Sequence, residues 1–175
     1  MTDLTIETQR LMLRTMRSSD IEDLMLIFGD PILMESFSAP PFSSEQMAGW
    51  IQRNLDHQKQ HGYGLFSVIL KSENSLIGNC GLEHMEYSGN PEVELGYDFR
   101  RGYWRQGFAT EAAVAVRDFA FNELKLPRLI SLIRVGNEAS RRVSQKIGMS
   151  LTEEISPGGT PYWVYAIDRS MNMKK

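Results

Sequence analysis

The hydrophobic positions of the chain fall into short groups separated by polar turns, and the spacing within each group predicts a secondary-structure element. Apolar residues at alternate positions or in short unbroken runs predict strands, and apolar residues at intervals of three and four predict helices. The predicted strands are residues 4–13, 65–70, 76–82, 93–99, 129–135, 149–155 and 162–168. The predicted helices are residues 21–28, 44–61, 108–124 and 138–147. This order of elements indicates a mixed α/β fold.

Polar residues mark where the first two helices begin. Ser19 with Glu22, and Ser43 with Gln46, have the spacing of capping boxes, in which each side chain bonds a backbone N–H of the other residue. Gly29 and Pro31 predict the end of the first helix, and a loop is expected from there to Ser43.

The strand at 93–99, the helix at 108–124 and the strand at 129–135 predict a βαβ crossover, whose two strands lie parallel in one sheet. The strands at 76–82 and 93–99 are joined by a turn-rich segment and predict an antiparallel hairpin. Ligands of such sheets bind beyond the carboxyl ends of the parallel strands. The crossover therefore directs attention to residues 99–110.

Composition excludes several classes of protein. The 175 residues are 42% hydrophobic, enough for one core, and we expect residues 1–175 to form a single domain. A balance of 19 basic against 22 acidic residues argues against nucleic acid as a partner. The apolar runs are too short to span a membrane, and the first residues lack the apolar stretch of a signal peptide. Cys80 is the single cysteine, so we expect a cytoplasmic protein without disulfides.

Residues 99–112, FRRGYWRQGFATEA, join a predicted strand to a predicted helix. The first N–H groups of a helix have no intrahelical partner, and the helix dipole is positive at that end. Gly107 and Ala109 would let an anion approach the main chain closely. Local positive charge comes from Arg100, Arg101 and Arg105. The segment thus predicts a pyrophosphate site, with an ordinary glycine turn carrying surface arginines as the alternative.

Several motifs surround this junction: ELGY at residues 94–97, WRQGFA at 104–109, GFATEA at 107–112 and NEASRRVSQKIGM at 137–149. WRQGFA resembles the cofactor signature Q/R-x-x-G-x-G/A of the GNAT superfamily of N-acetyltransferases, with tryptophan at its first position and Arg105 in place of a frequent glycine. Together the motifs look like the RimJ/RimL-type ribosomal-protein N-acetyltransferases. The resemblance starts at RLMLR, near Arg10, and covers nearly the whole chain.

The resemblance implies the GNAT fold, a twisted and mostly antiparallel central sheet with a splayed parallel βαβ pair, flanked by helices. It also implies acetyl-CoA as co-substrate, an amine acceptor and no metal. Main-chain amides of residues 106–110 would hold the pyrophosphate, residues 97–99 would pair with pantetheine, and Asn137 would contact pantetheine. The implied cofactor residues are Tyr97, Asp98, Phe99, Arg105, Gln106, Gly107, Phe108, Ala109, Thr110, Asn137, Arg141, Ser144 and Lys146.

An amine attacks a thioester only after losing its proton, so the predicted reaction needs a general base. Glu94 is the first candidate, because strand alternation places Glu92, Glu94, Gly96 and Asp98 on one face beside the expected thioester position. Glu83 and His84 on the preceding strand are the other candidates. The alternative for Glu94 is a structural ion pair with an arginine.

The departing thiolate must gain a proton. Many members of the superfamily use a tyrosine seven positions after the asparagine, where this chain has Ser144. The RimJ/RimL-type branch offers a serine three positions after the asparagine, which is Ser140 here and is the predicted acid. Helix capping or a contact with pantetheine is the alternative role for Ser140. A backbone N–H of residues 95–97 would bind the carbonyl oxygen.

The acceptor stays open between a protein N-terminus and a small amine such as a polyamine, an amino acid derivative or an aminoglycoside. The rival function is a CoA-binding regulatory module without turnover. His57 and His61 have helical spacing that suits zinc but no third ligand in register, and a solvated helix face is the preferred interpretation. A homodimer is a further hypothesis, in which the strand at 162–168 is a sheet edge that pairs with a second copy.

Overall fold

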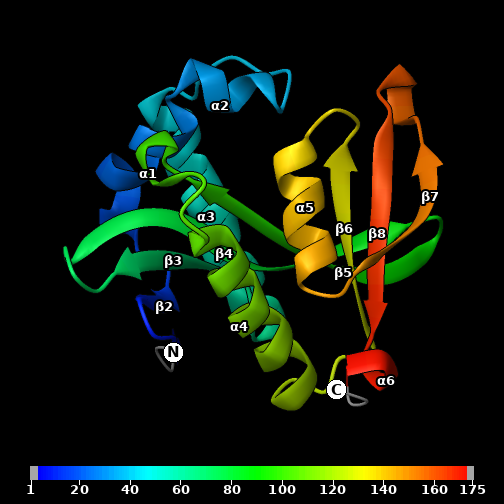
Figure 1. Ribbon diagram of the computed structural model, residues 1–175. Helices are drawn as coiled ribbons and strands as arrows, with labels where there is room; N and C mark the ends of the chain where they lie inside the picture. Colours follow the sequence, from blue (N-terminus) through cyan, green and yellow to red (C-terminus); the bar gives the residue numbers. More distant parts are fainter. Residues whose placement is uncertain (1–3, 173–175) are drawn as a thin grey trace.

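The structure is a computed structural model that describes residues 4–172, built on one sheet of eight strands (Figure 1). The strand order is β1-β2-β3-β4-β5-β6-β8-β7, and β5 and β6 form its parallel pair. The strands are β1 (Thr5–Glu7), β2 (Leu11–Thr15), β3 (Leu65–Leu70), β4 (Ser75–Tyr87), β5 (Asn90–Phe99), β6 (Arg128–Arg134), β7 (Ser150–Ile155) and β8 (Tyr162–Asp168). The helices are α1 (Ile21–Phe28), α2 (Pro31–Glu35), α3 (Ser44–His61), α4 (Phe108–Asn122), α5 (Glu138–Lys146) and α6 (Arg169–Asn172). The predicted mixed α/β class is confirmed.

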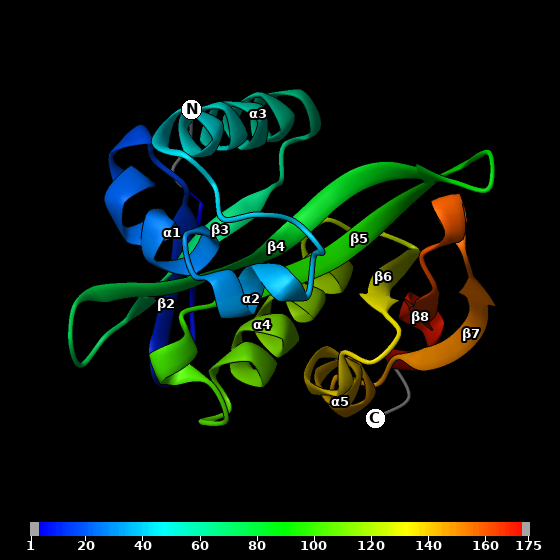
Figure 2. The ribbon, with the colours of Figure 1, turned by 90° about the horizontal axis from the view of Figure 1, so that it is seen from above.

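Helices cover both faces of the sheet, with α1 and α3 on one face and α4 and α5 on the other (Figure 2). The core between the sheet and α4 holds a stripe of small residues on this helix, and its members Ala112, Ala113, Val116 and Ala120 are all fully buried. A second core lies under α1 and α3 and includes Met47. Among residues 4–172, no helix has both the length and the apolar character needed to cross a membrane.

Three local predictions about the N-terminal part are wrong. The segment predicted as one strand over residues 4–13 forms two strands, because the chain turns at Thr8, whose hydroxyl accepts the Leu11 N–H at 2.9 Å. The box at Ser19 does not cap α1, which follows a 3-10 turn (η1, Ser18–Asp20) and has Asp20 at its N-cap. The segment after α1, expected as loop, contains α2. The second predicted box, at Ser43, is confirmed.

Helix α2 begins at Pro31, one of the two residues predicted to end the first helix. Proline suits the first helical position because the N–H it lacks would have no partner there, and the Asp30 carboxylate caps the helix. Asp30 also forms an ion pair with Arg101 at 3.0 Å, and Arg134 donates to the Glu35 carbonyl at 3.4 Å. These contacts tie α2 to the segment after β5 and to the end of β6, at the end of the sheet to which β6 points (Figures 1 and 2).

Strand β8 lies inside the sheet, between β6 and β7. The expectation that residues 162–168 form an edge is therefore wrong, because both sides of this strand are occupied by neighbours. Its aromatic residues Trp163 and Tyr165 are buried against the core. The homodimer hypothesis loses the edge on which it was based.

A buried carboxylate joins the first strands to α1. Asp20 accepts hydrogen bonds from both terminal nitrogens of Arg14 at 2.7 and 2.8 Å, from the Arg17 N–H at 2.9 Å and from the Ser67 hydroxyl at 2.7 Å. Burial alone would raise the pKa of Asp20, but these hydrogen bonds outweigh it and hold the pKa below its ordinary value. The charged form of Asp20 therefore stabilises the fold at neutral pH.

We expect Asp20→Asn to lower the free energy of unfolding by about 3 kcal/mol, because it removes the buried, charged carboxylate that accepts two hydrogen bonds from the Arg14 guanidinium. Glu22→Gln on the exposed side of α1 is the control and should change the stability by less than about 0.5 kcal/mol. Urea unfolding at pH 7 measures both. Equal stability of the two variants would contradict this role for Asp20.

Candidate active site

The parallel strands β5 and β6 meet at one point and then separate. Glu94 and Ile130 are their one registered pair among the described residues. Beyond this pair, the hydrogen bonds between the two strands run from side chain to backbone. The Ser131 hydroxyl donates to the Leu95 carbonyl at 2.7 Å, and the Glu94 carboxylate accepts the Leu132 N–H at 3.1 Å. Since these bonds replace the next rung of backbone pairing, they fix the point at which the gap opens.

The backbone of β5 presents free hydrogen-bonding groups to this gap. The Arg100 N–H donates to the Ile77 carbonyl on β4, and the antiparallel pattern then directs the backbone of Leu95, Tyr97 and Phe99 toward β6. The indole N–H of Trp104 donates a hydrogen bond to the Phe99 carbonyl at 2.6 Å. The Leu95 and Phe99 carbonyls thus both accept hydrogen bonds from side chains. Tyr97 lies between these two residues, and its backbone N–H and C=O face the gap.

Helix α4 starts at the mouth of the gap. Its N-cap, Gly107, has φ of 84°, a conformation that favours glycine, and the preceding Arg105 also has a positive φ, 62°. The Gln106 amide group donates to the Gly102 carbonyl at 3.0 Å and so holds the loop in a tight turn. Within the N-terminal turn, the N–H groups of residues 108–110 have no intrahelical partner. This end of α4 is suited to an anion.

Arg10, which was not among the predicted site residues, supports the same turn. It forms an ion pair with Glu111 at 2.6 Å, donates to the Gln106 carbonyl at 3.0 Å, and lies over the Phe108 ring at 4.3 Å. Burial would raise the pKa of Glu111, but hydrogen bonds from Thr8 and Arg10 lower it below its ordinary value. The contact joins residues 96 positions apart, and no local pattern could reveal it.

An open groove of about 690 Å³ runs beside the start of α4. It contains three predicted cofactor residues, Gly107, Thr110 and Lys146, and is closed on its other side by residues 6–8 of the first hairpin. Lys146 lies at the end of α5 and brings a positive charge to the groove. The groove extends from the start of α4 along the helix, and it is also lined by Glu7, Glu111 and Asp118, each of which forms an ion pair with a basic side chain.

Carboxylates gather on the α3 face of the sheet, where β5 starts to leave β6. Glu94 is directly opposite Glu83 on β4, and Asp98 is opposite Asn79, whose amide group donates to it at 3.4 Å. Burial raises the pKa of Glu94 to about 7, and the charges of Glu83 and Asp98 add to this while the Leu132 N–H opposes it. Burial likewise raises the pKa of Asp98 to about 7. At neutral pH each carboxylate can therefore hold or release a proton.

Comparison with known proteins shows the family to which the chain belongs. The family model described as "Acetyltransferase (GNAT) domain" matches residues 10–150. The chain belongs to the GNAT acetyltransferase family. The protein YkkB of Bacillus subtilis is 35% identical over 90% of this chain and 92% of its own length, and other relatives carry the name N-acetyltransferase.

Solved structures agree with this assignment. A GNAT-family acetyltransferase from Bacillus anthracis superimposes with a TM-score of 0.82 at 29% identity, over 95% of this chain and 99% of that one. RimL, an alpha-N-protein acetyltransferase of a ribosomal protein solved with coenzyme A, has a TM-score of 0.78 at 18% identity, covering 94% of this chain and 98% of that one. The predicted GNAT fold is confirmed, and RimL shares this fold.

In this GNAT domain, α5 lies beside β6, on the side of the gap opposite β5 (Figure 1). Its N-cap is Asn137, whose side chain accepts the Ser140 N–H at 3.1 Å. The Tyr97 hydroxyl donates to the Ser140 carbonyl at 2.9 Å, and burial raises the pKa of Tyr97. Ser144 is fully buried one turn further along the helix. The structure thus brings Tyr97, Ser140 and Ser144 together.

The predicted residues Arg141 and Asp98 point elsewhere. The Arg141 guanidinium lies over the Trp163 ring at 4.8 Å and donates to the Tyr165 hydroxyl at 3.1 Å, so it contacts β8 and does not line the groove. Asp98 directs its backbone toward β4, away from the gap. Its side chain lies on the α3 face instead.

The three histidines of the chain cluster at the end of α3. His57 accepts the His84 N–H at its Nε2, at 2.8 Å, and its Nδ1 lies 3.1 Å from the Tyr63 carbonyl. Since a carbonyl can only accept, His57 is neutral with its proton on Nδ1. His61 stacks on His84 with ring centroids 4.7 Å apart. Sequence spacing showed the pair on α3 but not His84, which comes from β4.

We expect acid to destabilise the fold through His57. Burial first, and then the charge of His61, lower its pKa below the ordinary value of 6.5, so the unfolded chain binds the proton more readily. This part of the stability is present above about pH 6.5 and is lost as the pH falls below it. Urea unfolding of wild type and His57→Gln between pH 7.5 and 5.5 should show wild type losing more stability on acidification. Parallel pH dependence of the two proteins would contradict this.

Proposed function

We propose that the protein transfers the acetyl group of acetyl-CoA to a primary amine by direct attack, with Glu94 as the general base. One observation carries the proposal: the gap between β5 and β6 ends at a half-buried carboxylate and opens toward the N-terminus of α4. Such a gap joins a binding site for an extended cofactor to a proton acceptor at its inner end.

Acetyl-CoA fits the groups that the gap and helix leave free. The main-chain amides from Gln106 to Thr110 would hold the pyrophosphate, and Lys146 and the adjoining groove would hold the nucleotide end. The Tyr97 C=O and the Phe99 N–H, which both face the gap, would pair with the pantetheine amides as a neighbouring strand would. The coenzyme A bound to RimL supports this assignment of the donor.

Glu94 would accept the proton of the ammonium, directly or through water, before the nitrogen attacks the thioester carbonyl. A pKa of about 7 suits this step, because the carboxylate is basic enough to take the proton and is largely ionised just above neutral pH. As the C–N bond forms, negative charge develops on the carbonyl oxygen, and the Tyr97 N–H is the backbone donor facing that position. The half-buried Glu83, opposite Glu94, has a raised pKa through burial and could pass the proton onward.

Ser140 is the proposed donor to the thiolate when the C–S bond breaks. It lies at the start of α5, where the Tyr97 hydroxyl contacts its carbonyl. The Tyr97 phenol and the buried Ser144 hydroxyl lie on the same side of the gap and are the other hydroxyls within this region. A comparison of Ser140→Ala, Ser144→Ala and Tyr97→Phe in kcat would assign the donor among them.

Thiol release from acetyl-CoA tests the proposal against a panel of amines, with N-terminal peptides, polyamines, amino acids and aminoglycosides as acceptors. Amine-dependent release that comes with an N-acetylated product in equal amount is the expected result. Tight binding of acetyl-CoA without release for every amine would overturn it in favour of a regulatory CoA-binding module.

A further inference from the structure

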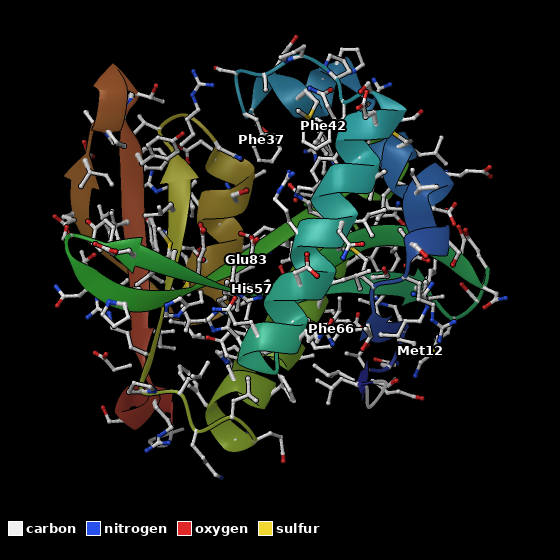
Figure 3. All side chains as sticks on the ribbon, turned by 180° about the vertical axis from the view of Figure 1, so that it is seen from behind. Met12, Phe37, Phe42, His57, Phe66 and Glu83 are labelled. Carbon is white, nitrogen blue, oxygen red and sulfur yellow. The ribbon has the colours of Figure 1, made fainter. Side chains whose placement is uncertain are left out.

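On the α3 face of β5, the space above Gly96 is open and is bordered by acidic side chains; we call it the Gly96 pocket, with the glycine as its floor. Strand alternation places the Glu94 and Asp98 side chains on either side of this glycine, and Glu83 and Asn79 stand opposite them on β4. Figure 3 shows Glu83 on this face, beside His57 at the side of α3. A Cβ built on Gly96 would meet no heavy atom within 4 Å, so the space above the floor is open.

The side chains of this pocket accept hydrogen bonds and offer almost none. Glu83, Glu94 and Asp98 form no ion pair with a basic side chain among residues 4–172. The Asn79 side-chain N–H donates to Asp98. The Asn79 side-chain oxygen is fully buried and has no hydrogen-bond partner in the described part of the chain. An unpartnered buried acceptor is costly, and a ligand that donates would satisfy it.

Lining of this kind selects a cation. A ligand of several N–H donors and positive charge would pair with the carboxylates and with the Asn79 oxygen, whereas a carboxylate or phosphate would be repelled. The carboxylates flank the floor on both sides, and Glu94 and Asp98 are four residues apart, about 13 Å along the strand. One ammonium group at Glu94 cannot also reach Asp98, so the second carboxylate calls for a second cationic nitrogen.

We propose that the acceptor is a small dication, in which the reacting primary amine lies beside Glu94 and a second cationic nitrogen is bound by Asp98 and the Asn79 oxygen. This assignment rests on the proposed function and adds to it the class of acceptor. Gly96 is then the floor across which the acceptor lies, and a side chain there would displace it.

Putrescine and pentylamine test the proposal, because they have the same length and differ in the second nitrogen. We expect kcat/KM for putrescine to exceed that for pentylamine by about tenfold or more, because only the diamine can form a charged hydrogen bond with Asp98. Asp98→Asn should bring this ratio close to one. Glu86→Gln, at an exposed position on the same hairpin, is the matched control and should keep the wild-type ratio.

Equal kcat/KM for the two amines in wild type would overturn the dication, and so would turnover of peptide N-termini with no turnover of diamines; the proposed acetyl transfer would stand in both cases. If no amine is turned over, the proposed function fails, and calorimetric titration still tests the pocket. Putrescine should then bind at least tenfold more tightly than pentylamine and lose this advantage in Asp98→Asn, while equal binding of both amines would overturn the pocket as well.

Discussion

Gly107→Glu should raise the Kd for acetyl-CoA by at least about a hundredfold. Gly107 has φ of 84° at the N-cap of α4, and a residue with a Cβ costs roughly 1–2 kcal/mol in this left-handed conformation. The new carboxylate would also stand where the pyrophosphate is expected to bind, so two negative charges would meet at a site built for one. Isothermal titration with acetyl-CoA measures the change.

Gly89→Glu provides a control matched in both respects. Gly89 has φ of 76° at the tip of the β4–β5 hairpin, and a Cβ there would meet no heavy atom within 4 Å. The control introduces the same charge and the same backbone strain away from α4, and it should bind acetyl-CoA with the wild-type Kd. If Gly107→Glu also binds with the wild-type Kd, the anion site is not at the start of α4.

Glu94→Gln should lower kcat by roughly 10²–10⁴-fold, because it removes the proton acceptor and keeps the shape of the side chain. The glutamine oxygen can still accept the Leu132 N–H, so the junction of β5 and β6 stays intact and the Kd for acetyl-CoA should change little. In wild type, kcat should rise with pH through about 7, as Glu94 loses its proton. This rise should disappear in the variant.

Glu92→Gln is the control for Glu94→Gln, because Glu92 lies on the same face of β5 but pairs with Arg128 at 3.5 Å. Its kcat and pH dependence should match wild type. A kcat for Glu94→Gln within a few fold of wild type, with the rise through pH 7 preserved, would exclude Glu94 as the base and leave it the structural role that its bond to Leu132 already provides.

Much of the fold follows from local sequence signals. The β5–α4–β6 crossover could be predicted because β5 alternates polar and apolar residues, β6 is a short apolar run and α4 has a helical stripe of small residues. Its parallel pairing followed from the handedness and length of the connection. Helix α2 was missed because Pro31 both begins helices and ends them, and only the cap at Asp30 decides between the two.

The candidate site was also predictable in part, because local sequence signals encode some of its residues. Gly107 and the α4 amides are encoded within one continuous segment, and strand alternation alone placed Glu94, Gly96 and Asp98 on one face. The support from Arg10, the way Glu94 ends the β5–β6 ladder and the contact of His57 with β4 depend on residues far apart in the chain. Such contacts form only after the sheet is assembled, and no local periodicity reports them.

The most direct test of the central claim is to follow the acetyl group itself. Acetyl-CoA labelled with ¹³C in the acetyl carbonyl, incubated with the protein and an amine, should give an amide carbonyl resonance in equal amount to the free thiol, and Gly107→Glu should give neither. Label that stays in acetyl-CoA with every amine, or that appears only as acetate, would contradict acetyl transfer to an amine.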